Sequence, residues 1–517
     1  MSYVSRKLDW QENFTQKQRV GNEAVRYVRM VLIEIAKLTF QDKLVELVDS
    51  LPVKLLPKDR VPIRCCQYKE RAVLKQRIMA GLGFGADEID MDWTPLSVYA
   101  QRALNRTKIT RPILTIMDIA CEHCVQSQYI VTDACAGCFA KPCVNSCPKD
   151  AISILPNAKA KIDPGKCIKC GNCMRSCPYH SIIRIPIPCE ESCPVQAITR
   201  NPKTGFQVLD FNKCISCGAC VDSCLFGAIA HKSQVIDVCK FIKDTRRSRQ
   251  VVAMLAPSIV GQFGKSDLFQ IVAAIKMLGF SQVVEVAHGA DVTTQHEAKE
   301  FLERINADPN TVMTTSCCFS YLELVHKHIP TVKGFVSQTP TPMHYTAELV
   351  KNNIPNAICV FIGPCFSKKQ ESIEDPIVDY AITFEELACL FLAKGIDPIK
   401  VKPDTNLLFG NAHKEGRGYP YTGGVSAAVA SIIGNKAKVN IHKIDGFSDK
   451  TAECLEKFAH HKTPYNLLEV MACKGGCLRG PAVLSRKIVE NKKKVQNLQK
   501  KSDSLLDNLN PQKETNK

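Results

Sequence analysis

The sequence of 517 residues contains no run of about eighteen apolar residues, so we expect no membrane-spanning helix. Its start, MSYVSRKLDWQENF, lacks the apolar core of a secretory signal peptide. The net charge of +17 is accompanied by no motif that reads nucleic acid, which excludes nucleic acid as an expected partner. These absences predict a protein of the cytoplasm that needs neither a membrane nor nucleic acid.

Cysteine is abundant, with 27 residues in the chain. Without a secretory signal, so many thiols indicate metal ligation in a reducing compartment and not disulfides. Thiolates are the ligands that iron–sulfur clusters and zinc prefer. Sixteen of these cysteines fall between Cys121 and Cys224. Cys65 and Cys66 stand apart, just before a predicted helix, and we interpret them as small buried hydrophobic residues.

Two cysteine runs share the form Cys-x2-Cys-x2-Cys-x3-Cys, one starting at Cys167 and the other at Cys214. In ferredoxins of the bacterial type, three cysteines of such a run hold one 4Fe–4S cluster and the fourth ligates the neighbouring cluster. The runs must therefore come in pairs, and the run that starts at Cys135 is the partner of the first. The predicted ligand sets of this inner unit are Cys135, Cys138, Cys143 and Cys177 for one cluster, and Cys147, Cys167, Cys170 and Cys173 for the other.

The run at Cys214 has only half a partner nearby, in Cys189-x3-Cys193. We infer that the missing Cys-x2-Cys lies far upstream, because one two-cluster unit is inserted inside another. The predicted sets of this outer unit are Cys121, Cys124, Cys189 and Cys224 for one cluster, and Cys193, Cys214, Cys217 and Cys220 for the other. Zinc ribbons are the alternative for paired Cys-x2-Cys motifs, but the repeated spacing favours cubane clusters.

Hydrophobic spacing divides the rest of the chain. Residues 1–115 have helical periodicity, for example at Ala24, Val28, Val31, Ile35 and Leu38. After a charged linker at 243–249, predicted strands at 251–255, 283–286 and 357–362 alternate with helices such as 268–278. This alternation indicates an α/β domain with a mostly parallel sheet, in which ligands collect beyond the carboxyl ends of the strands.

The predicted fold class is therefore a multidomain α+β protein. We expect a helical N-terminal region (1–115), nested ferredoxin-type modules (116–245, with the inner unit at about 130–185), an α/β catalytic domain (246–490) and a basic, disordered tail (491–517). The basic residues are interpreted as a solvated face, with the steering of an acidic electron carrier as the alternative.

Three short motifs carry further thiols. They are Thr315-Ser-Cys317-Cys318, Gly363-Pro-Cys365 with Lys368 and Glu371 behind it, and Met471-Ala-Cys473-x3-Cys477. Cys473 and Cys477 would share one face of a helix, and with Cys318 and Cys365 they form a fifth set of four. Cys317 is then left beside the metal site as a candidate acid–base group.

These motifs, in this order behind ferredoxin-type units, resemble those of the FeFe-hydrogenases, over roughly residues 121–481. The resemblance implies an H-cluster, which is a 4Fe–4S cubane joined through a cysteine sulfur to a di-iron unit with CO, cyanide and a bridging dithiolate amine. It also implies that Cys318, Cys365, Cys473 and Cys477 ligate the cubane, with Cys477 bridging to the di-iron unit. Cys317 would exchange protons with the amine.

The resemblance implies further roles around this site. Lys368 and Ser258, the latter next to Pro257, would donate hydrogen bonds to cyanide ligands, and Met471 would pack near the bridging CO. A proton relay between solvent and Cys317 would use the residues that match the family's relay positions, namely Glu297, Glu300 and Ser337, with Glu371 at another family position. Phe319, Met343, Gly363 and Arg479 depart from the common pattern, which predicts a divergent subgroup.

We therefore expect an anaerobic hydrogenase that interconverts H2 with protons and electrons and exchanges electrons with a ferredoxin-like carrier through four accessory clusters. Di-iron maturation enzymes are the other expected partners. One alternative is a hydrogenase-like iron–sulfur assembly protein, which would lack the extra cysteine of the Cys317–Cys318 pair. Another is an H2 sensor, which would carry a signalling module, and none is visible after Pro481.

Overall fold

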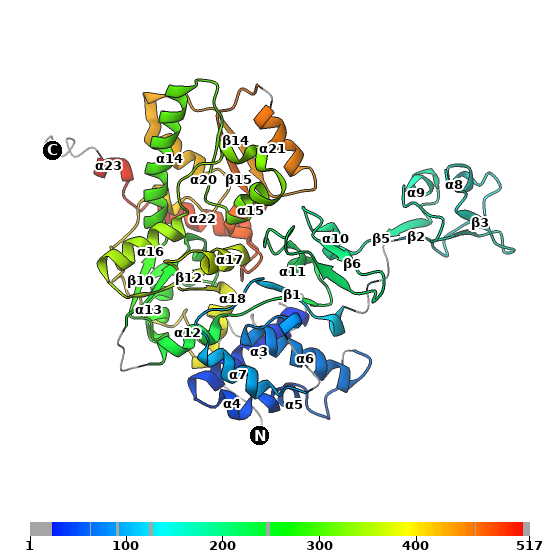
Figure 1. Ribbon diagram of the computed structural model, residues 1–517, viewed down its shortest axis with the longest axis horizontal. Coiled ribbons are helices and arrows are strands. Elements are labelled where there is room, and N and C mark those ends of the chain that lie inside the picture. Colours follow the sequence, from blue (N-terminus) through cyan, green and yellow to red (C-terminus); the bar gives the residue numbers. More distant parts are fainter. Residues whose placement is uncertain are drawn as a thin grey trace.

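The computed structural model describes residues 23–62, 64–88, 93–121, 124, 128–244, 249–460 and 462–509. Figure 1 shows three parts: a helical N-terminal region at the bottom, an α/β domain that fills the upper left, and a region of short strands that reaches out to the right. None of the helices in the described part of the chain is long and apolar enough to cross a lipid bilayer.

The N-terminal region is built on two packed helices, α3 (Glu23–Phe40) and α6 (Gln67–Leu82). Of the positions with predicted helical periodicity, Val31, Leu32, Ile35 and Leu38 are buried on α3, whereas Ala24 and Val28 are half-buried. The smaller elements of this region are α4 (Leu44–Leu47), η1 (Val48–Ser50), α5 (Leu51–Leu55), η2 (Ala86–Glu88) and α7 (Leu96–Asn105).

The prediction that Cys65 and Cys66 are buried is wrong, because both side chains are exposed. Cys66 precedes the first residue of α6, and its sulfur accepts a hydrogen bond from the backbone N–H of Lys69 at 3.4 Å. The thiol therefore caps a helix that begins at the surface instead of filling the core, and a capping position requires access to the helix end.

The cysteine-rich region consists of four antiparallel strand pairs. β1 (Leu114–Ile116) pairs with β8 (Ile229–His231), β2 (Gln128–Val131) with β5 (Ile182–Ile185), β3 (Ile152–Ile154) with β4 (Ala160–Ile162), and β6 (Ile198–Arg200) with β7 (Gln207–Leu209). Short helices accompany them: η3 (Asp118–Ala120), α8 (Pro142–Asn145), α9 (Asn172–Ser176), α10 (Pro188–Glu191) and α11 (Ala219–Ser223).

The pairing of β1 with β8 joins the segment before Cys121 to the segment after Cys224, so the outer unit closes around the inner one. The β2–β5 pair forms the neck from which the inner unit projects away from the body of the protein (Figure 1). The strand pairing therefore places the inner unit between the two halves of the outer one.

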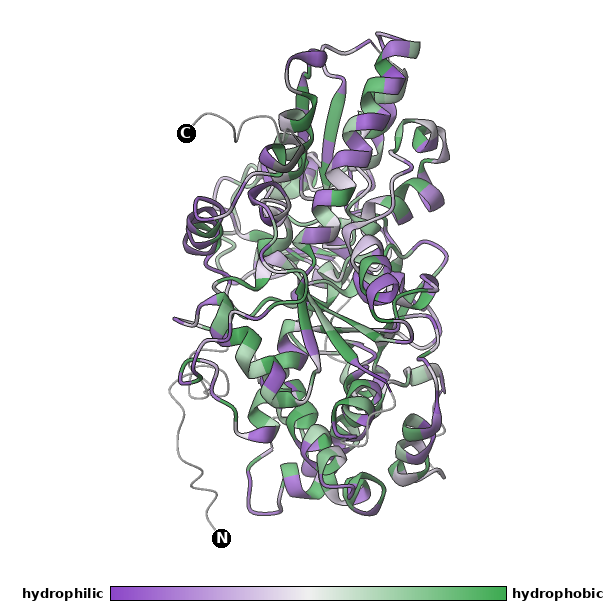
Figure 2. Ribbon diagram, turned by 90° about the vertical axis from the view of Figure 1, so that its left-hand side faces the viewer, coloured by the Kyte–Doolittle hydropathy of each residue, from purple (hydrophilic) through white to green (hydrophobic). Residues whose placement is uncertain are grey.

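Two parallel sheets form the core of the α/β domain. The first has the order β10 (Gln282–Glu285), β9 (Val251–Leu255), β12 (Ile358–Gly363) and β13 (Tyr380–Thr383), and the second has the order β11 (Met313–Thr314), β15 (Leu467–Met471) and β14 (Ile441–Asp445). The predicted strands and the parallel topology are confirmed. β9, β12 and β13 are buried along their whole length, and Figure 2 shows strands in the middle of the molecule that are largely hydrophobic.

Helices cover these sheets and connect their strands. The longer ones are α13 (Leu268–Leu278), α14 (Ala287–Ala307), α15 (Phe319–His328), α16 (Pro342–Asn353), α17 (Phe366–Glu374), α18 (Phe384–Lys394), α20 (Gly424–Ile433) and α21 (Thr451–His460). The short ones are η4 (Pro257–Ile259), η5 (Pro330–Phe335), α19 (Lys414–Arg417), η6 (Gly434–Lys436) and η7 (Gly476–Arg479).

The chain end differs from the disordered tail expected from residue 491. Helices α22 (Ile488–Gln499) and α23 (Leu505–Leu509) follow η7, and Asn491, Val495 and Leu505 are buried. Glu415 accepts hydrogen bonds from Ser504 Oγ at 2.8 Å and from the Leu505 backbone N–H at 2.9 Å. A few apolar residues are enough to anchor this basic segment. The NPQKETNK segment and linker residues 245–248 lie outside the described residues.

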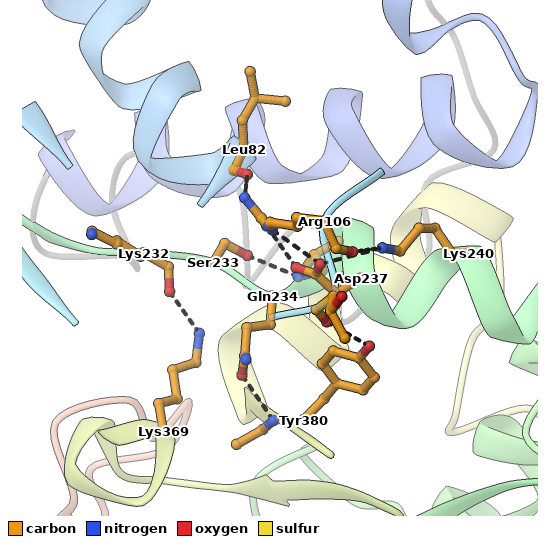
Figure 3. A network of polar contacts seen from close by, with 12 residues as sticks. Leu82, Arg106, Lys232, Ser233, Gln234, Asp237, Lys240, Lys369 and Tyr380 are labelled. Carbon is orange, nitrogen blue, oxygen red and sulfur yellow. Dashed lines mark hydrogen bonds and ion pairs between the residues drawn. The ribbon is translucent and has the colours of Figure 1, made fainter. Parts of the chain in front are cut away.

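A polar network around α12 (Val235–Ile242) connects the N-terminal region, the cysteine-rich region and the α/β domain (Figure 3). Arg106 of the N-terminal region donates two hydrogen bonds to Asp237, at 3.0 and 2.6 Å. Gln234 accepts the backbone N–H of Ala381 from the α/β domain at 2.9 Å. Lys369 Nζ donates to the Lys232 carbonyl at 3.3 Å. These contacts fix the cysteine-rich region against the α/β domain.

Candidate functional site

The structure brings the displaced cysteines of the outer unit together. Cys121, Cys124, Cys189 and Cys224 line one small cavity, whose other walls include Phe226 and Ile229. Burial, and then the neighbouring thiols of Cys224, Cys121 and Cys124, raise the pKa of Cys189 to about 12. In this apolar pocket each thiol makes it harder for the others to lose a proton. The four can become thiolates together only if a cationic metal core binds them.

The second set of the outer unit lies on the side of the catalytic domain. Burial and the thiols of Cys214 and Cys193 raise the pKa of Cys217 to about 12, and Cys365 of the catalytic domain contributes to the same shift. Backbone N–H groups point at these sulfurs, from Ala197 to Cys193 at 3.2 Å and from Ser216 to Cys214 at 3.4 Å. Such hydrogen bonds are typical of the sulfurs that ligate iron–sulfur clusters.

The inner unit contains the two remaining sets. Cys147, Cys167, Cys170 and Cys173 line a second small cavity, beside Tyr129 and Ile152. In the other set, Cys143 lies near Cys138 and Cys177. Burial and these two thiols raise the pKa of Cys143.

The thiols of the three catalytic motifs gather where parallel strands end. Cys318 follows β11 and begins α15, Cys365 follows β12 and begins α17, and Cys473 follows β15. Burial and the thiols of Cys365, Cys477 and Cys318 raise the pKa of Cys473 well above its usual value. The fifth set therefore converges from three loops that follow strands of both parallel sheets, and ligands of α/β folds bind beyond such carboxyl ends of strands.

Cys473 and Cys477 do not share a helix, which corrects the expectation from their spacing. The chain turns between them at Gly475 and Gly476, with φ of 87° and 76°. At Gly476 a Cβ atom would lie 2.8 Å from the Pro420 carbonyl oxygen, so the turn has no room for a side chain. A tight glycine turn brings the two sulfurs together in place of a helical face.

Among the described residues, no group of three or more His, Cys, Asp or Glu is arranged to hold a single metal ion. In a cubane each thiolate binds a different iron atom, so its four ligands stand farther apart than the ligands of one ion. The cysteine-lined cavities fit that larger group.

Cys317 lies beside the fifth set, half-buried and in contact with the apolar cluster that includes Met471 and Tyr419. Burial, and then the charges of Glu297 and Cys318, raise the pKa of Cys317 well above its usual value. The thiol is therefore protonated at neutral pH, as a proton donor must be.

Glu297 is completely buried on α14. Its Oε1 accepts hydrogen bonds from the backbone N–H of Ser316 at 2.9 Å and from the Ser316 hydroxyl at 3.1 Å. Burial raises the pKa of Glu297 to about 7, although the hydrogen bonds from Ser316 oppose the shift. Its Oε2 has no hydrogen-bond partner among the described residues. The carboxyl group can therefore hold or release a proton near neutral pH.

Glu300 lies one helical turn later, as predicted, and sits in a polar setting. It accepts hydrogen bonds from Ser337 Oγ at 2.6 Å, from the Gln338 backbone N–H at 3.1 Å and from Arg304 at 2.6 Å. These donors lower the pKa of Glu300 although burial works against them.

Ser316, Thr339 and Arg304 were missed by the sequence reasoning. Thr339 Oγ1 donates to Glu300 at 3.2 Å, and the Thr339 carbonyl accepts from Ser316 Oγ at 2.6 Å. These contacts link the surroundings of Glu300 to Glu297. The spacing of Glu300 and Arg304 was a usable signal, whereas nothing near Thr339 in the sequence indicates its contacts.

Lys368 and Glu371 form their own group. Lys368 Nζ donates to Glu371 at 2.6 Å, and Thr341 donates a short hydrogen bond to the same carboxylate. Burial opposes the charge of Lys368, but Glu371 and the thiols of Cys317 and Cys365 raise its pKa. The polar contacts of Glu371 in the described structure are thus with Lys368 and Thr341, and not with the Glu297–Glu300 pair.

Ser258 and Pro257 belong to η4, directly after β9. The Ser258 side chain is 1% exposed, and its hydroxyl has no hydrogen-bond partner among the described residues. Buried polar atoms without partners are rare in folded proteins. This hydroxyl and the free Oε2 of Glu297 are the polar atoms expected in a site that receives a polar group, so the residues fit the H-cluster.

Two of the unusual positions have a packing explanation. Met343 is completely buried on α16. At Gly363 a Cβ atom would lie 2.4 Å from the ring of Phe361, so this ring occupies the space of a side chain. The phenyl group of Phe361 therefore excludes a larger residue in front of Pro364.

Parts of the chain match known protein families. Residues 249–481 match the family described as iron only hydrogenase large subunit, C-terminal domain, and residues 134–181 and 208–230 match 4Fe-4S dicluster and 4Fe-4S binding domains. The chain is 27% identical over 393 residues to iron hydrogenase 1 of Clostridium pasteurianum, in a match that covers 64% of this chain and 66% of that protein.

Two further proteins are similar over shorter stretches. The large subunit of a periplasmic Fe hydrogenase of Nitratidesulfovibrio vulgaris is 26% identical, over 48% of this chain and 72% of that protein. A solved structure of an FeFe-hydrogenase of Chlamydomonas reinhardtii aligns with a TM-score of 0.41 at 19% identity, over 51% of this chain and 87% of that one.

Proposed function

We propose that this chain, whose residues 249–481 match the iron-only hydrogenase family, interconverts H2 with two protons and two electrons. The observation that carries the proposal is the meeting of four thiols with the spare thiol of Cys317 and the buried carboxyl group of Glu297, whose pKa is about 7. A metal site that only transfers electrons has no need of the last two groups.

Cys318, Cys365, Cys473 and Cys477 would hold the cubane of the H-cluster, with Cys477 as the bridge to the di-iron unit. When bound, the H-cluster supplies the redox-active iron at which H2 is made and split. Lys368 and the partnerless hydroxyl of Ser258 are the donors for its anionic ligands. Pro257 holds the backbone of η4 next to Ser258, and Met471 is buried in the apolar cluster that contacts Cys317.

Protons would move between solvent and the site along residues of α14 and the loops beside it. Cys317 holds the proton nearest the site, and Glu297 exchanges it because its pKa lies close to neutral pH. Ser316, Thr339 and Ser337 hold the two carboxyl groups in place by hydrogen bonds, and Glu300, with its lowered pKa, would exchange protons at the solvent end of the path. Glu371 would act on Lys368 instead, by keeping the ammonium charged.

Electrons would pass through the four accessory clusters. The Cys217 set lies nearest the catalytic thiols, since the Cys365 thiol acts on the pKa of Cys217. The inner unit projects farthest from the body (Figure 1). Residues 130–185 contain eight lysines and arginines against three aspartates, and Phe139 is fully exposed there. This basic surface favours an acidic ferredoxin-like carrier as the electron partner.

The cysteines also bear on where the reaction takes place. All 27 are free thiols in the structure. Because so many unpaired thiols are typical of proteins kept in a reducing environment, we propose an anaerobic cytoplasm as the location.

Infrared spectroscopy of the full chain, produced with di-iron maturation enzymes, tests the proposed function. CO and cyanide bands together with H2 evolution from a reduced ferredoxin are expected, and chain produced without those enzymes is the control that lacks both. Absence of the bands after maturation would contradict the hydrogenase proposal. Bands without turnover would point to a sensing or assembly role.

A further inference from the structure

Two arginines of the N-terminal region converge on the loop that follows Cys224. Arg64 Nη2 donates to the Phe226 carbonyl at 3.0 Å, and Arg77 Nη2 approaches the Phe226 and Gly227 carbonyls at 3.5 and 3.4 Å. Phe226 lines the cavity formed by Cys121, Cys124, Cys189 and Cys224. The guanidinium groups therefore reach the backbone that encloses this cysteine set.

Arg77 lies close to the thiol of Cys224 itself. Both residues line a cavity of about 620 Å3 between the N-terminal region, the outer unit and the catalytic domain. Ala228 directly follows Gly227, and its backbone N–H donates a hydrogen bond to Cys224 Sγ at 3.3 Å. At Gly227 a Cβ atom would come within 2.9 Å of Arg77 Nη2 and 2.2 Å of Ala24 Cβ. The loop can pass this closely only because residue 227 is glycine, here with φ of 58°.

The charge of Arg77 is poorly compensated by the protein. Its side chain is 6% exposed, its Nε has no hydrogen-bond partner among the described residues, and the face of the Tyr27 ring lies 5.8 Å away. Burial lowers the pKa of Arg77 to about 10, so the guanidinium remains charged at neutral pH. The other groups that act on its pKa are Arg64, which lowers it, and Tyr27, Glu70 and Cys224, which raise it. One carboxylate thus faces two guanidinium groups, and a buried cation of this kind needs a nearby negative charge.

A 4Fe–4S cluster with four thiolate ligands supplies that charge, because it is anionic and gains one more negative charge on reduction. We propose that Arg77, supported by Arg64, raises the reduction potential of the cluster held by Cys121, Cys124, Cys189 and Cys224. The inference rests on the proposed function, which places a cluster there. The helical N-terminal region would then have a role in electron transfer, because it places the positive charge of Arg77 next to one of the clusters.

The physical basis is electrostatic. A positive charge beside the loop that encloses a partly buried cluster stabilises the reduced state more than the oxidised state, and buried surroundings screen this effect less than water does. The cluster held by Cys121, Cys124, Cys189 and Cys224 is therefore easier to reduce than it would be without the N-terminal region. Electrons that arrive from the projecting inner unit would be drawn towards the catalytic domain.

An EPR-monitored redox titration of the full chain with its accessory clusters tests the inference. Arg77→Met should move one midpoint potential to more negative values and leave the others in place, and Arg77→Lys should restore much of the shift. Arg71→Met is the matched control, because Arg71 lies on the same helix but donates to the Leu56 carbonyl. The shifted signal should be the one that Cys124→Ser alters.

The possible results distinguish an error in the role of Arg77 from an error in the assignment of the cluster ligands. An unchanged set of midpoints in Arg77→Met, with wild-type iron content, would overturn the role of Arg77. If Arg77→Met loses the cluster altogether, Arg64→Met decides, because it removes the second cation and should shift the same midpoint in the same direction. A wild-type protein with no signal that depends on Cys124 would instead contradict the cluster assignment.

Discussion

The hydroxyl and the backbone N–H of Ser316 both point at Glu297 Oε1, at 3.1 and 2.9 Å, and Ser316 is the residue directly before Cys317. The motif that carries the spare thiol therefore also fixes the carboxyl group beside it. Oε2 of the same carboxyl group keeps no partner among the described residues. A carboxyl group with one oxygen fixed and the other free is suited to accept and pass on a proton.

Replacing Glu297 by Gln should lower H2 turnover by about a hundredfold or more, because general acid–base groups contribute on the order of 10²–10⁴ to rate. The CO and cyanide bands should remain, since Glu297 is not a ligand. Glu303→Gln is the control, because Glu303 lies on the same helix with its side chain exposed. Turnover at the wild-type level in Glu297→Gln would remove this residue from the path.

The raised pKa of Glu297 predicts a pH dependence of stability. The folded protein holds this proton up to about pH 7, whereas the unfolded chain releases it near the ordinary value of 4.5. Between these values the folded state binds more protons, so its stability falls as pH rises through that window. Thermal unfolding should therefore show the wild type losing stability relative to Glu297→Gln from pH 5 to about pH 7, and parallel curves would contradict the assignment.

Cys317→Ala should retain the infrared bands and lose H2 turnover by a similar factor, because the thiol is placed to carry the last proton and not to bind iron. Cys454→Ala is a suitable comparison, since Cys454 is an exposed cysteine on α21, away from the motifs. Loss of the bands in Cys317→Ala would mean that this thiol is needed to hold the H-cluster.

Iron analysis checks the nested cluster sets. Chain produced without di-iron maturation should bind about twenty iron atoms, four for each of five cubanes. Cys124→Ser should lower this value by up to about four and leave the signals of the inner unit unchanged. A wild-type content near ten would exclude the nested assignment.

The buried ion pair of Lys369 and Glu386 predicts a stability effect at the domain junction. The two groups lie 2.6 Å apart, and the charge of Lys369 helps to lower the pKa of Glu386 to about 2 despite burial. Lys369→Met should destabilise the protein by about 3–5 kcal/mol, because a buried charge is left alone. Calorimetry should show that the double variant with Glu386→Gln recovers most of the loss, whereas additive losses would show that the pair is not coupled.

The cysteine sets could be predicted because ligand geometry restricts the spacing along the chain. Cys121 and Cys124 meet Cys189 and Cys224 across an inserted unit, as their pattern required. The strands of the catalytic domain were equally predictable, since continuous apolar runs such as 251–255 occur in buried parallel sheets.

Features that depend on tertiary contacts were not predictable. The hydrogen bonds of Thr339 connect segments far apart in the sequence, and the turn at Gly475 and Gly476 replaces the helix that the Cys473–Cys477 spacing indicated. Cys66 caps a helix at the surface, although a cysteine that ligates no metal is usually a small buried residue. The segment from 488 to 509 folds because Val495 and Leu505 find buried sites that the local composition does not reveal.

The pairing of β1 with β8 has a consequence for the order of synthesis. The ligands of the inner unit are complete once Cys177 has been made, whereas the set at Cys121 needs Cys224, and the strand pair that closes it needs residues 229–231. Cys121 and Cys124 thus leave the ribosome first among the cluster ligands but wait about a hundred residues for their last partner. The ligand sets predicted for the inner unit are therefore synthesised before those predicted for the outer unit are complete.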